Sequence, residues 1–373
     1  MMAKKQIAQD GGRAPEAMVS GVIGIDTGYS AVKIYSEVNG SPRTMIFPSV
    51  TGDAQFADDF LDNGEENDFI AELSLEPGVI RNVGETAVRL NRGGETTTDR
   101  EEFTRTYNPA LTIAGLARFL SEKRLPVPEM IVVGLPVNFY AAYRDAISKS
   151  LAGEHTVKLY HRDKSVRAEV FIPIERVLVL PQGYGSYLSW ALDAQGSKIA
   201  DRLRPTAVID GGEKTIDIAC AEGRYIDEYS KSIPSSLDSV YHIMQRELDA
   251  RFDDFLSRSE IESYIRSNQP YVASSGQRVD LAAMRLEILQ RQTPEIINRI
   301  QETIRPMRPT QVLVAGGSGE LLFEPLRRVF PFAEMIKPAV FSNAIGFYKY
   351  GLLRRGAENG SRATVKQAGG AAA

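Results

Sequence analysis

Short apolar runs alternate with longer stretches of helical periodicity along most of the chain. Apolar runs typical of strands cover residues 22–26, 31–35, 129–134, 176–180, 206–209, 216–221 and 311–315. Apolar residues recur at helical spacing over 110–123, 184–194, 239–255, 281–304 and 320–329. Strands of this length separated by helices predict an α/β protein.

Four segments lie outside this alternation. Residues 1–20 are polar and glycine-containing, and residues 354–373 end in small residues, so we expect disordered tails at both positions. Residues 45–105 contain loops and charge runs such as Asp58-Asp59 and Glu65-Glu66, whereas residues 230–300 are mostly helical in pattern. We expect these two segments to be insertions whose charged residues face solvent.

The composition is that of an ordinary soluble globular protein. The 373 residues include 44 Lys+Arg and 48 Asp+Glu, for a net charge of −4, and 43% are hydrophobic. This length predicts two or three domains, and the charge argues against direct binding of nucleic acid over a broad surface. No apolar run reaches the roughly 18 residues that a membrane helix needs, and residues 1–20 contain no signal-peptide pattern. With a single cysteine, which excludes an internal disulfide, a cytoplasmic protein without a membrane anchor is expected.

The same inventory disfavours zinc sites and covalent catalysis. The three histidines have no metal-ligand spacing, and Cys220 lies in an apolar strand, where a buried structural role is expected. The segment 316–320 lacks the last glycine of a nucleophile elbow, and no glycine directly precedes Lys214, as a P-loop would require.

A ten-residue segment is repeated at a distance of 184 residues. The segment from Ile25 to Ile34 (IDTGYSAVKI) aligns without gaps on that from Ile209 to Ile218 (IDGGEKTIDI), with identical Ile-Asp, glycine and final isoleucine. Each copy predicts an apolar strand that ends in an aspartate, a glycine turn and a second strand. The repeat therefore predicts two similar domains, each beginning with a β-hairpin, that face each other across a cleft.

The residue types in these turns suit a nucleoside triphosphate. Glycine lets backbone N–H groups approach phosphate oxygens, and Lys33 would supply a positive charge. Asp26 and Asp210 would repel bare phosphate, but both fit a site that holds Mg²⁺ through water molecules. Asp-x-Gly is also a common structural turn, so each hairpin alone leaves a purely structural role open. A third glycine cluster, Gly316-Gly317-Ser318-Gly319, follows an apolar strand and precedes a helix, as in nucleotide sites at helix N-termini.

These three motifs, in this order, resemble those of the actin-like ATPase superfamily over about residues 21–353. Within it, Phe47-Pro48-Ser49-Val50, Val133-Gly134-Leu135-Pro136 and the segment from Ser342 to Tyr348 resemble bacterial and archaeal proteins of the ParM/StbA type. The resemblance implies an actin-like fold with domain I at 21–183, domain II at 184–340 and a helix at 341–353 that returns to domain I. The insertions at about 45–105 and 230–300 would belong to domains I and II.

The resemblance also implies the site residues. Gln182 would orient the attacking water, and Asp210 would act with it in hydrolysis, with Asp26 and Asp210 holding Mg²⁺ through water. ATP, or alternatively GTP, would be bound by residues of the three motifs: Asp26, Thr27, Gly28, Tyr29, Ser30, Lys33, Gly211, Gly212, Glu213, Lys214, Thr215, Gly316, Gly317 and Ser318. The family usually has a glycine before the helix that borders the nucleotide, but residues 232–238 contain none, so no base contacts are assigned within 238–250.

The resemblance implies a filament-forming ATPase in which Mg-ATP drives head-to-tail assembly and hydrolysis destabilises the polymer. Its expected task is the segregation of plasmid or other DNA through a separate DNA-binding adaptor, with no direct contact to nucleic acid. A metabolite or sugar kinase, or an ATPase that does not polymerise, is the alternative on the same fold. A kinase needs a carboxylate base at the substrate hydroxyl, and the sequence has Gln182 at the connecting position.

Overall fold

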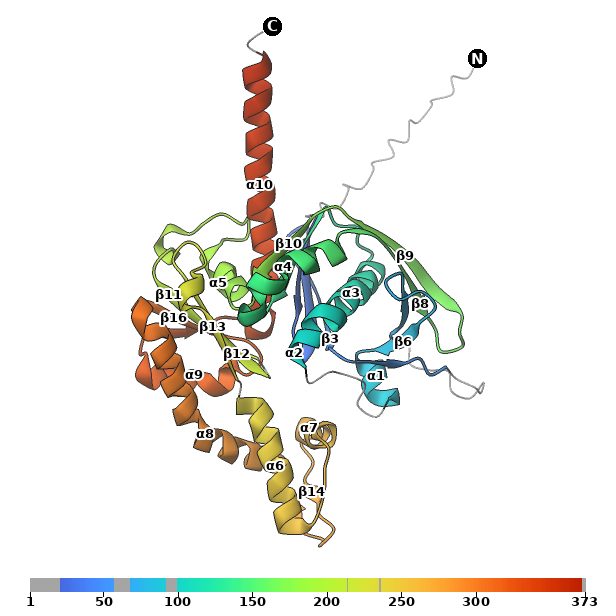
Figure 1. Ribbon diagram of the computed structural model, residues 1–373, viewed down its shortest axis with the longest axis vertical. Helices are drawn as coiled ribbons and strands as arrows, with labels where there is room; N and C mark the ends of the chain where they lie inside the picture. The colour runs from blue at the N-terminus through green and yellow to red at the C-terminus, as the bar shows by residue number, and fades with distance from the viewer. Residues whose placement is uncertain (1–20, 57–67, 92–98, 213, 235, 371–373) are drawn as a thin grey trace, which may run out of the picture.

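The computed structural model describes residues 21–56, 68–91, 99–212, 214–234 and 236–370. Two domains, each built on a five-stranded mixed sheet, lie side by side, and a long C-terminal helix projects from the body between them (Figure 1). The mixture of sheets and helices confirms the predicted α/β class. Among the described residues, no helix combines the length and the apolar character needed to span a membrane.

The first sheet of domain I carries the first repeat. Its strand order is β10-β7-β1-β2-β3, with β1 parallel to β7 and antiparallel to β2. The strands are β1 (Val22–Thr27), β2 (Ala31–Val38), β3 (Ser41–Pro48), β7 (Met130–Leu135) and β10 (Val177–Pro181). Because β1, β7 and β10 run in the same direction, their carboxyl ends meet at one edge, where ligands of open α/β sheets bind.

A second, antiparallel sheet completes domain I. Its order is β4-β6-β5-β8-β9, formed by β4 (Thr51–Asp53), β5 (Ile70–Leu73), β6 (Ile80–Val83), β8 (Gly153–Tyr160) and β9 (Val166–Ile174). The helices of this domain are α1 (Glu85–Leu90), α2 (Arg100–Glu102), the π-helix η1 (Phe103–Tyr107), α3 (Asn108–Lys123) and α4 (Val137–Leu151). The segment predicted as an insertion thus supplies three strands, and the hairpin of β8 and β9 supplies the other two.

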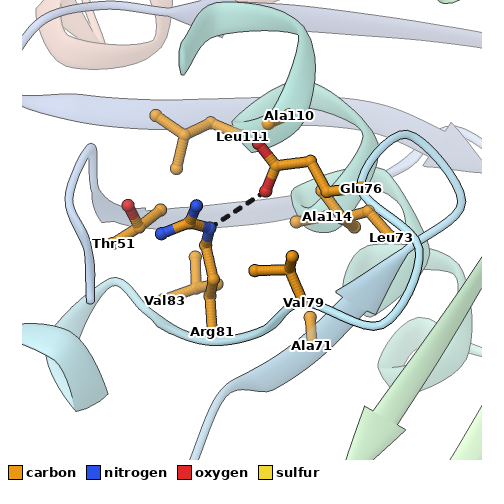
Figure 2. Close-up of a pocket in the computed structure, with 10 residues that line it drawn as sticks. All are labelled: Thr51, Ala71, Leu73, Glu76, Val79, Arg81, Val83, Ala110, Leu111 and Ala114. Carbon is orange, nitrogen blue, oxygen red and sulfur yellow. Dashed lines mark hydrogen bonds and ion pairs between the residues drawn. The ribbon is translucent and has the colours of Figure 1, made fainter. Parts of the chain in front are cut away.

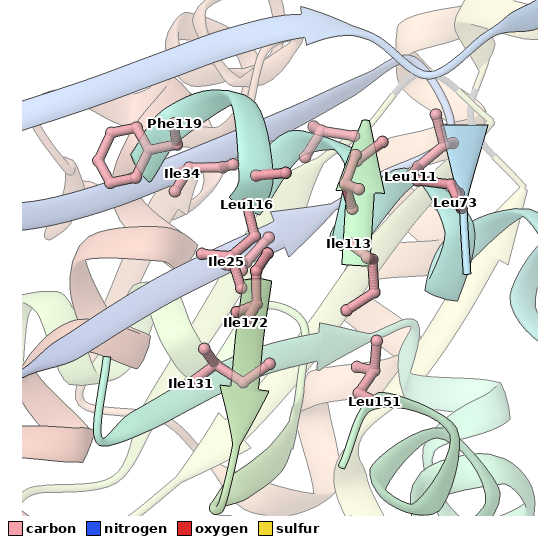
Figure 3. Packing of buried hydrophobic residues seen from close by; sticks show 14 of the residues in the cluster. Ile25, Ile34, Leu73, Leu111, Ile113, Leu116, Phe119, Ile131, Leu151 and Ile172 are labelled. Carbon is pink, nitrogen blue, oxygen red and sulfur yellow. The ribbon is translucent and has the colours of Figure 1, made fainter. Parts of the chain in front are cut away.

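Helix α3 forms the core of domain I between the two sheets. Leu116 and Phe119 pack beside Ile25 and Ile34 of the first sheet, and Ile172 lies beside them from β9 (Figure 3). Eleven of the 16 residues of α3 are buried, because sheets cover it on opposite sides. The helix therefore fixes the first hairpin relative to the second sheet.

Domain II repeats the first sheet and adds a helical insertion. Its order is β13-β12-β11-β16-β17, formed by β11 (Thr206–Gly211), β12 (Thr215–Ala221), β13 (Lys231–Pro234), β16 (Gln311–Ala315) and β17 (Ala333–Met335). The helices that accompany this sheet are α5 (Tyr184–Ala191) and α9 (Gly319–Val329). Short 3₁₀ helices connect its elements: η2 (Ala200–Arg202), η3 (Asp227–Tyr229), η4 (Arg305–Met307) and η5 (Ala339–Phe341). The insertion consists of α6 (Ser236–Phe252), α7 (Arg258–Ser267), β14 (Tyr271–Val272), β15 (Arg278–Val279) and α8 (Leu281–Ile304).

Helix α10 (Ser342–Gly370) differs from the predicted C-terminal region. We expected a helix over 341–353 and a disordered tail from 354, but the helix continues to Gly370. Its extension is anchored by ion pairs to domain I, from Arg355 to Glu129 and from Arg176 to Glu358. The small residues that suggested a tail include several alanines, which have the highest helix propensity.

The first turns of α10 cross α5 at very short range. A Cβ atom at Gly346 would lie 1.7 Å from the carbonyl oxygen of Gly185, so the crossing requires glycine. Close packing at this point fixes the N-terminal end of α10 beside the start of α5. The crossing therefore determines where the neighbouring Asn343 lies.

Domain I also contains an apolar pocket between its second sheet and α3 (Figure 2). Leu73, Val83 and Leu111 contribute to its wall, and Arg81 Nε lies 3.0 Å from Glu76 Oε2 beside it. None of the residues predicted to bind nucleotide lines this pocket. The predicted chemistry lies elsewhere, at the facing edges of the two main sheets.

Candidate functional site

The first repeat folds as the hairpin of β1 and β2. Asp26 and Lys33 face each other across it, and Lys33 Nζ lies 3.4 Å from Asp26 Oδ2. The adjacent Thr27 is held by α3, because its hydroxyl lies 2.8 Å from Thr112 Oγ1 and its carbonyl accepts a bond from Asn108 Nδ2. The turn then closes with a 3.1 Å hydrogen bond from the Gly28 N–H to the Ala31 carbonyl. A buried carboxylate with its cationic partner thus lies directly beneath the turn.

The second repeat folds as the hairpin of β11 and β12, in the same register. Asp210 and Asp217 face each other, at the positions that Asp26 and Lys33 occupy in the first hairpin. Asp217 accepts hydrogen bonds from the Ser232 hydroxyl, from the Val137 N–H at 3.4 Å and from Thr215 Oγ1 at 3.4 Å. The lysine of one hairpin is therefore replaced by a second carboxylate in the other.

The third glycine cluster packs against the second hairpin. Gly316 follows β16 at a φ of +81°, which turns the chain back toward β11. The Ser318 N–H donates to the Gly211 carbonyl at 3.0 Å, and the Ser318 hydroxyl donates to the Gly212 carbonyl at 3.0 Å. The second and third motifs therefore form one surface at the edge of the sheet of domain II, where α9 begins.

Gln182 and Asn343 connect the two hairpins. Gln182, which is 7% exposed at the end of β10, donates from Nε2 to Asp26 Oδ1 at 2.8 Å. Asn343, in the first turn of α10, donates from Nδ2 to Asp210 Oδ2 at 2.6 Å. The side-chain oxygen of Asn343, Oδ1, accepts hydrogen bonds from the backbone N–H groups of Gly183 and Ser186, at 2.9 and 3.0 Å. A short path of hydrogen bonds and backbone thus joins Asp26, Gln182, Asn343 and Asp210.

The carboxylates of this cluster are poorly solvated. Burial, followed by the negative charges of Asp26 and Asp217, raises the pKa of Asp210 to about 7. Burial raises the pKa of Asp217 to about 6, although hydrogen bonds from Ser232, Val137 and Thr215 oppose the shift. Three carboxylates share one nearby lysine, so the site has an excess of negative charge that a cation would neutralise.

The donor set fits Mg²⁺ that keeps water in its coordination shell. Carboxylate oxygens are ligands that Mg²⁺ prefers, and both strand-end aspartates lie beside turns suited to phosphate. Within the described part of the chain, no three or more His, Cys, Asp or Glu side chains converge tightly enough to hold a metal ion by themselves. A cation here would therefore take most of its ligands from water and phosphate, with Asp26 and Asp210 acting through that water.

We predict that the stability of the nucleotide-free protein falls as the pH rises from about 4 through 7. The pKa of Asp210 is about 7 when folded and about 3.9 when unfolded, so its stabilising protonation is complete below pH 4 and lost as the pH rises through 7. Asp210→Asn removes this titration and keeps an acceptor for Asn343. Between pH 5.5 and 8.5, we expect the variant to gain at least about 1.4 kcal/mol over wild type in urea unfolding with EDTA.

A constant difference between the two proteins over that pH range would contradict the assignment. Asp201→Asn, at an exposed aspartate of the same domain, serves as the control and should follow the wild-type curve.

Nearly all of the predicted site residues lie at the facing edges of the two domains. The two hairpin turns also approach each other, because Lys214 Nζ lies 5.3 Å from the centre of the Tyr29 ring. Tyr29 in turn packs on Phe103, with ring centres 4.6 Å apart. Glu213 lies outside the described residues. Gly317 borders open space, since a Cβ atom there would meet nothing within 4 Å.

Several polar residues that support the cluster were not predicted from the sequence. Asn343 connects Gly183, the residue after Gln182, to Asp210. In the sequence, Asn343 was noted only as part of the segment from Ser342 to Tyr348 that resembles ParM-type proteins. Asn138, at the start of α4, donates to the Ser232 carbonyl at 3.2 Å and accepts the Ser232 N–H at 3.0 Å. Asp217 was visible in the repeat but had no predicted role. These residues connect the two domains behind the hairpins.

One protein-family model matches part of the chain. Residues 24–185 match the family model for the N-terminal domain of actin-like proteins. No match was found among curated protein sequences.

Solved structures similar to this one include ParM proteins and an archaeal actin homologue. A 15-stranded ParM filament from Clostridium botulinum is 20% identical, with a TM-score of 0.68, over 88% of this chain and 98% of that one. The archaeal actin homologue Ta0583 is 20% identical, with a TM-score of 0.66, over 90% and 99% of the two chains. Bacillus thuringiensis ParM with ATP is 15% identical, with a TM-score of 0.64, over 91% and 99%. The predicted actin-like fold is confirmed, and the resemblance to ParM proteins is confirmed at the level of the fold.

Proposed function

We propose that this chain, whose fold is that of the actin-like ATPases, binds ATP with Mg²⁺ between its two hairpins and hydrolyses it. The observation that carries the proposal is that the buried side chains of Asp26, Gln182 and Asp210 meet in one cluster with the partly buried Lys33. These residues come from two domains and are separated by up to 184 positions, so local structure alone would not bring them together. Structures similar to this one contain ATP and ADP, which supports a nucleotide as the ligand.

Each motif has a distinct role in this proposal. The turns that contain Thr27, Gly28, Tyr29 and Ser30 in the first hairpin and Gly211, Gly212, Lys214 and Thr215 in the second would lie against the phosphates, and Lys33 and Lys214 would add positive charge. Asp26 and Asp210 hold water molecules that bind Mg²⁺, which neutralises charge on the phosphates when it is bound. Gly316, Gly317 and Ser318 form the flat surface on which the nucleoside rests, beside the N-terminus of α9.

Gln182 acts by positioning rather than by accepting a proton. Its amide is neutral near pH 7, and its Nε2 is bound to Asp26, so its Oε1 remains available to orient a water molecule. Phosphoryl transfer depends mainly on the alignment of the nucleophile and on stabilisation of charge. A residue that orients water without taking its proton is compatible with slow hydrolysis. Slow hydrolysis suits a polymer, because the polymer must persist for some time before its nucleotide is hydrolysed.

Gln182→Ala is expected to slow phosphate release by about tenfold or more, with nucleotide affinity within about twofold of wild type. The substitution removes the group that orients water but leaves the turns, Lys33 and both carboxylates in place. Phosphate release under single-turnover conditions, together with equilibrium binding of a fluorescent ATP analogue, measures the two quantities separately. Gln195→Ala, at an exposed glutamine, is the matched control. Phosphate release at the wild-type rate would remove Gln182 from the mechanism.

The chain is further proposed to assemble head to tail into filaments. One similar structure is a ParM filament, and another is described as a non-polymerisable ParM mutant. A head-to-tail contact does not close on itself, so one kind of subunit produces an open polymer. Assembly would be favoured by bound Mg-ATP and reversed after hydrolysis, in the cytoplasm. The net charge of −4 supports attachment to plasmid or other DNA through a separate adaptor rather than directly.

Electron microscopy and sedimentation of the purified protein test this function. We expect polymers with Mg²⁺ and ATP, and with GTP if the site accepts either base, but none with EDTA and no nucleotide. Phosphate release without polymer at any salt or protein concentration would favour a non-polymerising ATPase. Phosphate transfer to a member of a sugar panel would favour a kinase.

A further inference from the structure

A groove of about 420 Å³ opens on domain I, away from the nucleotide motifs. Thr44 and Ile46 of β3 line one of its sides, and charged side chains of α1 and α3 line the others. Figure 1 shows β3, α1 and α3 together in domain I. None of the residues predicted to bind nucleotide lines the groove. Its volume is in the range of sites that bind ligands, and its polar walls suit a ligand that is charged or forms hydrogen bonds.

The edge of the first sheet runs along this groove. Strand β3 is the last strand of that sheet and pairs with β2 on one side only. At the end of this pairing the Ser49 N–H donates to the Ser30 carbonyl at 3.1 Å, so odd-numbered residues of β3 direct their N–H and C=O groups toward β2. The N–H and C=O groups of Thr44 and Ile46 therefore point away from β2. Within the described part of the chain, no strand pairs with them.

Two prolines limit the length of this edge. Pro42 and Pro48 follow the same alternation as Thr44 and Ile46, so neither removes a hydrogen bond to β2. Since proline has no N–H group, the donors that remain on the edge are the N–H groups of Thr44 and Ile46. Prolines on an edge also prevent a long strand from pairing with it. The edge therefore suits a short extended segment of about seven residues.

A strand added to this edge would present its side chains to two different surfaces. The side chains of odd-numbered residues of β3 face α3, because a Cβ atom at Gly115 would lie 2.7 Å from Phe47 Cζ. Alternate side chains of the added strand would therefore enter the groove beside α3. The others would lie beside Ile46, which is 48% exposed on the opposite face of the sheet. The first set would meet charged groups, and the second would meet an apolar side chain.

Most charges in the groove wall are paired, but one cation is not. Arg118 Nε lies 2.7 Å from Glu122 Oε1, and Arg89 forms an ion pair with the buried Asp68. Lys123 is exposed and forms no ion pair with any residue that the structure describes. Its ammonium group is therefore available to an acidic side chain of a ligand.

A carboxylate without a partner lies at the other end of the groove. Glu85, the first residue of α1, is exposed and forms no ion pair within the described ranges of the chain. It follows Gly84, whose N–H donates to the Val50 carbonyl at 3.0 Å just after β3. Helix α3 begins beside Thr27 and runs away from the nucleotide edge, so Lys123, its last residue, lies where β3 begins. The groove is therefore positive at the beginning of β3 and negative at its end.

We propose that the free edge of β3 binds a short extended segment of a partner protein, which pairs antiparallel with Thr44 and Ile46. Antiparallel pairing is the more stable arrangement, and a segment in this direction starts near Glu85 and ends near Lys123. The site fits a segment with a basic residue at its start, an acidic residue at its end and apolar side chains beside Ile46. Main-chain hydrogen bonds hold such a segment, and its side chains provide specificity. This binding site is separate from the nucleotide site and from any polymer contact.

A second copy of the chain fits this edge less well than a short segment. Helix α1 contributes Thr86 and Arg89 to the groove wall. Pairing of two β3 strands about a two-fold axis would extend one sheet, and it would bring a second α1 and a second α3 to the same edge on the same face. The groove therefore accommodates a single strand rather than a second domain.

Ile46→Pro tests the main-chain pairing. The probe is a fluorescein-labelled heptapeptide with blocked ends, Lys-Val-Thr-Val-Thr-Val-Glu, and its binding to the nucleotide-free protein is measured by anisotropy. Proline at position 46 follows the alternation of Pro42 and Pro48, so pairing with β2 is kept while one donor to the peptide is lost. We expect the dissociation constant to rise at least about fivefold.

Ile46→Val is the matched control for this variant. It keeps the N–H group and an apolar side chain, so the affinity for the peptide should stay at the wild-type value. Both variants should hydrolyse ATP at the wild-type rate, because position 46 lies outside the nucleotide motifs. Equal affinity of wild type and Ile46→Pro would overturn the inference, as would the absence of peptide binding up to about 1 mM.

Charge reversal tests the direction of the segment. Lys123→Glu should weaken binding of the heptapeptide at least about threefold, and a peptide with Lys in place of its last Glu should bind this variant better than it binds wild type. Lys149→Glu, at an exposed lysine in the last turn of α4, is the control and should leave the affinity unchanged. Wild-type affinity in Lys123→Glu would contradict the proposed direction.

Sedimentation velocity of the nucleotide-free protein distinguishes a partner from a second copy. We expect wild type and Ile46→Pro to be monomers alike. A wild-type dimer that dissociates in Ile46→Pro would assign the edge to a second copy and overturn the inference. None of these binding measurements requires ATP or polymer, so a failure of the proposed filament function would leave their outcome unchanged.

Discussion

Replacing Asp210 by alanine is expected to reduce Mg²⁺-dependent ATP hydrolysis by at least about a hundredfold. Asp210 is the strand-end carboxylate of domain II, and Asn343 orients it through a 2.6 Å hydrogen bond. If Mg²⁺ is held as proposed, its water molecules would lose one of their two protein acceptors in this variant. The measurement is steady-state phosphate release at saturating Mg-ATP, with Asp201→Ala as the control at an exposed aspartate.

Substitutions of Asp210 should have opposite effects on the rate of hydrolysis and on the stability of the protein. Asp210 lies in a cluster with Asp26 and Asp217, and their negative charges contribute to its raised pKa. The Asp210→Asn variant should therefore lose hydrolysis while unfolding at a higher urea concentration than wild type at pH 8 without nucleotide. A buried carboxylate that lowers stability but is needed for activity is typical of functional sites. Hydrolysis by Asp210→Ala at more than a third of the wild-type rate would exclude Asp210 from the site.

The repeat predicted the two hairpins because their chemistry is local. An apolar strand, an aspartate, a glycine turn and an alternating strand are all readable from ten residues, and β1–β2 and β11–β12 have the predicted register. The alignment also pairs Lys33 with Asp217. The two hairpins are thus alike in backbone but differ in charge, because the second has the carboxylate of Asp217 where the first has Lys33.

The supporting residues could not be predicted because they depend on the packing of distant segments. Asn343 reaches Asp210 only because α10 crosses α5 at Gly185 and Gly346, and that crossing joins segments about one domain apart. Helix α4 and the β8–β9 hairpin were missed for a different reason. Their apolar positions are interrupted by charged and aromatic residues that the surrounding domain tolerates at its surface, so no clear period appears in the sequence.

The glycine cluster after β16 provides a pair of neighbouring positions with different expected effects. A Cβ atom at Gly316 would lie 2.3 Å from Asp210 Oδ1 and 2.4 Å from the Gly211 carbonyl oxygen, and its φ of +81° disfavours alanine. A Cβ atom at Gly317 would meet nothing within 4 Å, and its φ is not in the left-handed region. Both glycines were predicted to lie against the nucleotide. Alanine at position 316 therefore tests a residue that packs against Asp210, whereas alanine at position 317 tests a residue that would contact the nucleotide directly.

Gly316→Ala is expected to lower the free energy of unfolding by about 2–4 kcal/mol, because the methyl group displaces Asp210 and the β11 turn and the backbone is strained. Gly317→Ala should change the stability of the nucleotide-free protein by less than about 0.5 kcal/mol. If the cluster forms the floor of the nucleotide site, Gly317→Ala should nevertheless weaken ATP binding, because its methyl group enters the space that the nucleoside would occupy. Urea unfolding and equilibrium ATP binding of both variants provide the four values needed. Wild-type nucleotide affinity in Gly317→Ala would move the nucleoside away from this turn, and wild-type stability in Gly316→Ala would contradict the packing of the turn on Asp210.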